Sequence, residues 1–311
     1  MKRKTFAVST IALSSLLIAL LSLSIVAAET VTVYIYKINQ PETWKGKMFT
    51  MGHDTYWAGE IHIQYGGKPP SGTHTRAYCL EYDAILYTDR TYTYTIADVQ
   101  DNSQWKSISY ILSWYDPPTN NNEAAAIQGA IWKTLKGYDP SGYGNSLALE
   151  AQNKDVIRKT DKLLWTSPIS VVGPGEKITL TINVTDKNGN GRPNVRIKFA
   201  TTEGTLNKLE AFTDTNGEAN VTLTAPSEMG ISIEVTAWSK GVWPNKYICT
   251  SATQDLLGIG DDLGLTATTE IHVFARLNVI PDVPLGTITA VAACFLAFIA
   301  KTKKLRFHTK S

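Results

Sequence analysis

The chain has 311 residues, enough for about two globular domains together with targeting segments. It carries 30 lysine and arginine residues against 28 aspartate and glutamate residues, so its formal net charge is only +2. This balance excludes the strongly basic surface of a nucleic-acid-binding protein, and we expect no nucleic-acid partner.

Residues 1–28 have the pattern of a secretory signal peptide. A basic start, Lys2-Arg3-Lys4, is followed by an apolar run over residues 5–26 and by the small residues Ala27-Ala28. An uncleaved anchor helix is the alternative, because the apolar run is long for a signal core. We expect cleavage, since Val26-Ala27-Ala28 suits a signal peptidase, and therefore export of the rest of the chain.

Residues 29–165 form the first predicted domain, made of β-strands with a helical part. Alternating apolar residues predict strands over residues 30–37, 60–65, 75–81 and 91–96. Helical spacing predicts a helix over residues 103–115, which stops before Pro117-Pro118. A second helix follows, with Asn121 or Asn122 as its N-cap and Gly137 at its end.

Gln128 lies on an apolar stripe of this second helix. At about 100° per residue, the stripe also contains Ala124, Ile127, Ile131, Trp132 and Leu135. A glutamine in this place is expected to be buried, where an amide group without a partner costs about 1–3 kcal/mol. Either backbone groups satisfy the amide, or its carbonyl carbon is bonded to a sulfur atom.

Residues 168–275 form the second predicted domain, an all-β sandwich. Residues 177–185 alternate strictly, with Ile178, Leu180, Ile182 and Val184 on one face. Turn sequences rich in Asn, Asp and Gly occupy residues 186–191 and 214–217, and alternating segments resume after each. Short strands separated by such turns are typical of an immunoglobulin-like fold. The fold class is therefore mainly β.

The C-terminal part has the pattern of a membrane anchor. Residues 276–282 are a linker, the apolar run 283–300 is predicted to be a transmembrane helix, and the basic tail 301–311 is predicted to be cytoplasmic. The membrane is thus an expected partner, and the protein is expected at the cell surface as a single-pass protein with an extracellular N-terminal ectodomain. A sorting signal that is cut and replaced by another anchor is the alternative.

Two short segments carry the chemistry. Tyr78-Cys79-Leu80, together with residues 127–132 (Ile-Gln-Gly-Ala-Ile-Trp), resembles the Cys–Gln thioester domains of bacterial and archaeal surface adhesins. Their helix motif is usually written Thr-Gln-x-Ala-Ile-Trp, and here Ile127 replaces the threonine. The resemblance covers residues 30–165 and implies a thioester cross-link between Cys79 and Gln128.

Residues 168–275 resemble the bacterial Ig-like domains of the invasin kind, which act as stalks. The matching features are Val184-Thr185-Asp186 with its glycine-rich turn, and Thr213-Asp214-Thr215-Asn216-Gly217 before a strand. This resemblance implies a fold and no activity.

The two resemblances together predict an anchored adhesin. Its thioester would react with an amine or hydroxyl of a surface protein or glycan on another cell or a neighbouring envelope. Residues that we expect around the bond are Tyr78, Ile131 and Trp132. Asn183 and Asn220 start glycosylation sequons.

Two other functions stay open at the level of sequence. In the first, the protein binds without covalent chemistry and Cys79 is bridged to Cys249 by a disulfide. In the second, it is a secreted cysteine hydrolase that uses one of the nearby histidines, His53, His62 or His74. Protease signatures, phosphate loops and Cys/His metal clusters are absent from the sequence, so we expect no enzyme, no catalytic residue, no cofactor and no metal.

Overall fold

The computed structural model describes residues 29–37, 44–66, 74–166, 170–250 and 253–274. The predicted signal peptide, linker, transmembrane helix and basic tail, with Cys294, lie outside these residues. In the described part, no helix is long and apolar enough to cross a membrane.

The first unit is a closed barrel, with strand order β1-β4-β5-β16-β15-β6 and antiparallel pairing between all neighbouring strands. Its strands are β1 (Thr30–Ile35), β4 (Ile61–Tyr65), β5 (His74–Cys79), β6 (Arg90–Ala97), β15 (Asn245–Cys249) and β16 (Leu256–Gly258). Apolar side chains from alternate positions fill the barrel, among them Ile35, Ile61, Ile63, Tyr94 and Leu256.

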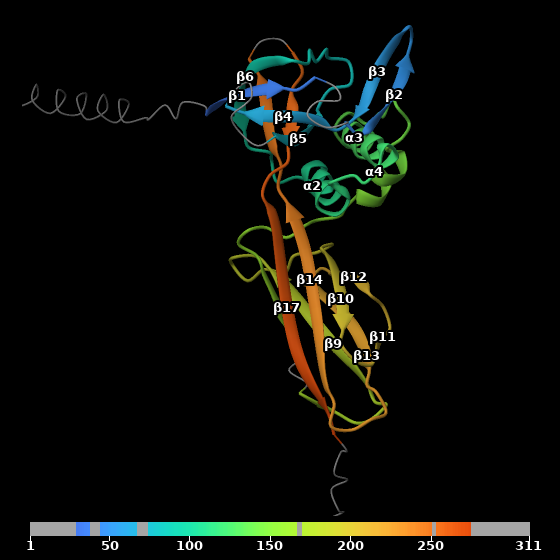
Figure 1. Ribbon diagram of the computed structural model, residues 1–311. Coiled ribbons are helices and arrows are strands. Elements are labelled where there is room, and N and C mark those ends of the chain that lie inside the picture. Colours follow the sequence, from blue (N-terminus) through green and yellow to red (C-terminus); the bar gives the residue numbers. More distant parts are fainter. Residues whose placement is uncertain (1–28, 38–43, 67–73, 167–169, 251–252, 275–311) are drawn as a thin grey trace, which may run out of the picture.

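Three helices and one hairpin pack beside the barrel (Figure 1). They are α2 (Ser103–Tyr115), α3 (Asn121–Lys136), α4 (Asn145–Ala151), and the hairpin of β2 (Gly46–Met51) and β3 (Asp54–Gly59). The N-cap of α3 is Asn120 rather than the expected Asn121 or Asn122, because the Asn120 side chain accepts hydrogen bonds from the N–H groups of residues 122 and 123. Gly137 ends α3 in the left-handed region, as predicted.

The second unit is a sandwich of two sheets, which confirms the predicted mainly-β fold class. One sheet has the order β12-β10-β14-β17-β8 and the other β11-β13-β9-β7. Their strands are β7 (Lys162–Trp165), β8 (Val171–Val172), β9 (Lys177–Thr185), β10 (Arg196–Thr201), β11 (Thr205–Leu206), β12 (Glu210–Phe212), β13 (Glu218–Thr224), β14 (Ser232–Val242) and β17 (Asp262–Val273). The alternating apolar face of β9 is buried between the sheets, as predicted.

The sheets divide the chain differently from the boundary expected at residues 165–168. Strands β15 and β16, which fall within the expected second domain, complete the barrel by pairing with β6 and β5. Strand β7, which falls within the expected first domain, pairs with β9 of the sandwich. Figure 1 shows the long strands β14 and β17 running from the sandwich towards the barrel, and β15 and β16 lie between them in the sequence.

Candidate functional site

Cys79 is the last residue of β5, and its side chain belongs to the barrel core. The residue is 7% exposed and belongs to the same buried cluster as Trp44, Trp132 and Leu256. On one side β5 pairs with β16, where Cys79 lies opposite Leu256. On the other side the register of β4 ends with Ile61 opposite Ala77, so no described strand pairs with Cys79 there.

Gln128 takes the place of that missing strand. The Cys79 N–H donates a hydrogen bond of 2.8 Å to Gln128 Oε1, and Gln128 Nε2 donates one of 2.8 Å to the Cys79 carbonyl. Gln128 is fully buried, as its place on the apolar stripe predicts. The two hydrogen bonds satisfy its amide group and fix that group beside Cys79.

The sequence around Gln128 holds α3 close to the loop that leads into α4. A Cβ atom at Gly144 would lie 1.9 Å from the Ala130 nitrogen, and one at Gly129 would lie 2.6 Å from Asp139 Oδ2. The same Asp139 carboxylate accepts a hydrogen bond of 2.7 Å from the Gly144 N–H. Glycine at both positions therefore allows close contact between the backbone of α3 and this loop.

Burial controls the protonation of the Cys79 thiol. Removal from water raises its pKa well above the ordinary value, and the Glu81 carboxylate raises it further. The thiol is therefore protonated at neutral pH, and attack by sulfur must be coupled to proton transfer. The Cys79 N–H already points at Gln128 Oε1, where negative charge would develop in such an attack.

A cavity of about 400 Å³ opens above Cys79. Trp132 lines it, and its ring is 5.9 Å from that of Phe49 and 6.3 Å from that of Tyr82. Further walls come from β3 and from the irregular segment 81–88. The cavity gives a route from solvent to the sulfur atom between aromatic side chains.

Of the three residues expected around the bond, Trp132 lines this cavity, whereas Tyr78 and Ile131 do not. Strand alternation turns Tyr78 away from Cys79, into the cluster formed with α2 and α3, where its hydroxyl donates to Asp116 Oδ1 at 2.8 Å. Ile131 is buried in the same cluster.

The cavity also includes residues that the sequence did not single out. Asp54, Glu81 and Gln254 line it, and the Gln254 side chain donates a hydrogen bond to the Glu81 carbonyl. Gln254 reaches the site because β16 pairs with β5. No local pattern marks these residues, since they meet only through the barrel.

The alternative Cys79–Cys249 disulfide does not fit this geometry. Strand β16 lies between β5 and β15, so the two cysteines are two strands apart, roughly 10 Å, whereas a disulfide needs Cα atoms within about 7 Å. The Cys249 sulfur instead lies 2.9 Å from Thr253 Oγ1. Neither residue takes part in a disulfide within the described part of the chain.

The histidines of the hydrolase alternative lie away from the sulfur. None of His53, His62 and His74 lines the cavity above Cys79. His62 is on the outer face of β4, where its Nε2 is 3.2 Å from Glu60 Oε1 and its ring stacks on His74. Among the described residues, no cluster suited to a metal ion occurs.

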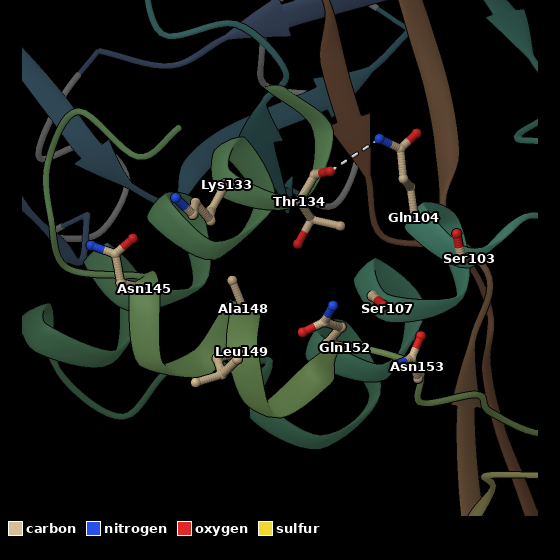
Figure 2. Close-up of a pocket in the computed structure, with 10 residues that line it drawn as sticks. All are labelled: Ser103, Gln104, Ser107, Lys133, Thr134, Asn145, Ala148, Leu149, Gln152 and Asn153. Carbon is tan, nitrogen blue, oxygen red and sulfur yellow. Dashed lines mark hydrogen bonds between the residues drawn. The ribbon is translucent and has the colours of Figure 1, made fainter. Parts of the chain in front are cut away.

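Two further features are separate from Cys79. A second cavity, of about 350 Å³, lies between α2, α3 and α4, and Figure 2 shows the Gln104 side chain donating to the Thr134 carbonyl there, at 3.2 Å. In the sandwich, Asn220 is exposed on β13, while Asn183 on β9 is half-buried and its Nδ2 donates to the Asn216 carbonyl at 3.5 Å.

Family models match both parts of the chain. The model described as "Thioester domain" matches residues 76–167, which include Cys79 and Gln128, and the model described as "Bacterial Ig-like domain (group 1)" matches residues 171–245. Both resemblances inferred from the sequence are therefore confirmed. No curated protein matches the sequence.

Solved structures give weaker similarities. The thioester domain of the Enterococcus faecium TIE86 protein is 11% identical, with a TM-score of 0.32, over 79% of this chain and 96% of that chain. The Bacillus anthracis TIE protein is 12% identical, with a TM-score of 0.32, over 79% of this chain and 49% of that one. The D0-D1 domain of intimin is 24% identical, with a TM-score of 0.21, over 33% and 46%. The chain spans about half the length of the intimin fragments that it matches.

Proposed function

We propose that the chain is a surface-anchored adhesin that stores an internal thioester between Cys79 and Gln128 and uses it to attach covalently to a partner. The observation that carries this proposal is the pair of 2.8 Å hydrogen bonds between the buried Gln128 amide group and the backbone of Cys79. The match of residues 76–167 to the thioester-domain model supports it.

Formation of the bond needs only these two residues. The Cys79 sulfur attacks the Gln128 side-chain carbonyl carbon, the thiol proton moves to the amide nitrogen, and the C–N bond breaks to release ammonia. The Cys79 N–H stays hydrogen-bonded to the carbonyl oxygen and stabilises the charge that develops on it. Fixed proximity replaces a separate enzyme, because well-oriented groups reach effective molarities of order 10⁵ M or more.

In the attachment step the Cys79 sulfur is the leaving group, whereas in formation of the thioester it is the nucleophile. An amine or hydroxyl of a partner protein or glycan enters the cavity and attacks the acyl carbon of Gln128. The C–S bond breaks, the nucleophile's proton passes to sulfur, and an amide or ester joins the partner to the protein. The reaction happens once per molecule, so we do not regard the protein as an enzyme.

The place of the protein in the cell rests on the sequence. The signal-peptide pattern of residues 1–28 and the apolar run 283–300 favour export and single-pass anchoring, with the cytoplasmic tail 301–311 inside. The Ig-like sandwich would then hold the barrel away from the membrane.

Methylamine tests the reactive bond. The protein should gain one methylamine on Gln128 and one additional thiol at Cys79, in equal amounts, because a nucleophile at the acyl carbon displaces the sulfur. Cys79→Ala should gain neither. An adduct mapped to another residue, or thiol release without an adduct, would contradict the proposal.

A further inference from the structure

The β2–β3 hairpin is a two-stranded sheet separate from the barrel and the sandwich. Figure 1 shows it beside α3 and α4, pointing away from the barrel. The base of the hairpin is fixed, since the Gly46 N–H donates to Asn121 Oδ1 at 3.3 Å, and Phe49 packs on Trp132. Strand β3 pairs with β2 along one edge, and no other described strand pairs with its second edge.

That second edge borders the cavity above Cys79. Four consecutive residues, 54–57, line the cavity. Side chains of a strand alternate between its two faces, so consecutive residues border one cavity when the strand presents its edge. We call this cavity the channel, and its lining includes the edge of β3, the segment 81–88, Cys79 and Trp132.

The register identifies which main-chain groups point into this channel. Met51 and Asp54 flank the two-residue turn Gly52-His53, so they form a hydrogen-bonded pair, and the next pair, Thr50 and Thr55, is not hydrogen-bonded. Thr55 and Trp57 therefore direct their N–H and C=O groups outward from β3. No hydrogen bond within the described part of the chain engages these main-chain groups.

The charge of the channel favours a basic occupant. Asp54 and Glu81 line it, and no lysine, arginine or histidine among the described residues does. The rings of Tyr56, Trp57 and Tyr82 line it as well and can stabilise a cation through their faces.

We propose that an extended segment of the partner polypeptide adds to the free edge of β3 as a third strand and so carries a lysine side chain to the thioester. This inference rests on the proposed function. Main-chain hydrogen bonds to Thr55 and Trp57 supply affinity and register. The lysine amine attacks the acyl carbon of Gln128, the C–S bond breaks, and the amine's proton passes to the sulfur of Cys79.

Coupling of a peptide tests this docking. The probe is a capped heptapeptide, Thr-Val-Thr-Lys-Thr-Val-Thr, compared with the same peptide methylated on alternate main-chain nitrogens and with methylamine. The wild-type protein should couple the first peptide faster than methylamine at equal concentration, on the order of tenfold or more. The N-methylated peptide should couple no faster than methylamine, because it cannot form the strand hydrogen bonds.

A matched pair of variants locates the docking edge. Thr55→Pro removes an N–H from the cavity edge, whereas Thr50→Pro removes the equivalent N–H from the opposite edge of the hairpin. Thr55→Pro should lower the rate of peptide coupling relative to the rate of methylamine coupling in the same variant, and Thr50→Pro should leave this ratio unchanged.

Three results would overturn the docking: equal coupling of both peptides, equal loss in both proline variants, or no preference of the wild type for peptide over methylamine. If Thr55→Pro also loses methylamine coupling, the comparison of the two peptides on the wild-type protein decides. Failure of the proposed function is distinct, because the wild-type protein would then gain no methylamine.

Discussion

The hydrogen bonds between Gln128 and Cys79 predict a measurable cost when the glutamine is removed without any thioester present. In a Cys79→Ala background the cross-link cannot form, but the backbone N–H and C=O of residue 79 still pair with Gln128. Adding Gln128→Ala leaves both buried groups without partners. At about 1–3 kcal/mol for each group, the free energy of unfolding should fall by roughly 2–6 kcal/mol.

Urea denaturation followed by tryptophan fluorescence measures this difference as a shift in midpoint at constant slope. Gln104→Ala is the matched control, because Gln104 also lies on a helix and donates to a backbone carbonyl, but it is exposed. That variant should change the free energy of unfolding by no more than about 0.5 kcal/mol. If the double variant is as stable as Cys79→Ala, the hydrogen bonds do not position the pair.

Three more predictions concern the packing, the barrel and the thiol. Gly144→Ala would place a Cβ 1.9 Å from the Ala130 nitrogen. It should therefore lower the free energy of unfolding by about 1–3 kcal/mol and reduce the fraction of protein with a thioester, measured by intact mass. Gly264→Ala is the control and should do neither, because no atom lies within 4 Å of a Cβ at Gly264. A fragment of residues 29–165 lacks β15 and β16, so it should show weak near-ultraviolet circular dichroism and no ammonia loss; a fully cross-linked fragment would contradict the closed barrel. In Gln128→Ala the Cys79 thiol stays buried, and burial raises its pKa. The free energy of unfolding should therefore be constant below the thiol pKa of the unfolded chain, about 8.5, and should fall as the pH rises above that value. Urea midpoints that stay constant above pH 9 would contradict this expectation.

Local patterns predicted the secondary structure well, because they depend on local geometry. The spacing of apolar residues gave α2 over residues 103–115 and the buried face of β9, and the apolar stripe of α3 gave the burial of Gln128. The N-cap of α3 lies one or two residues earlier than predicted, because any of the three consecutive asparagines 120–122 has a side chain suited to an N-cap.

Contacts between residues that are far apart in the sequence could not be predicted from local patterns. An alternating segment shows that a strand forms but not which strand pairs with it. The pairing of β15 and β16 with the barrel, which brings Gln254 to the site, was therefore not predicted. Cys79 and Gln128 are 49 residues apart, and the family resemblance, not periodicity, brought them together. Tyr78 does not line the cavity, because strand alternation directs its side chain to the opposite face of β5 from that of Cys79.

The intact mass of the wild-type protein, prepared without added amines, decides whether the thioester exists. We expect a mass one ammonia lower than the sequence requires, and the full mass for both Cys79→Ala and Gln128→Ala. A disulfide would instead remove two hydrogens. A wild-type protein with the full sequence mass would contradict the thioester.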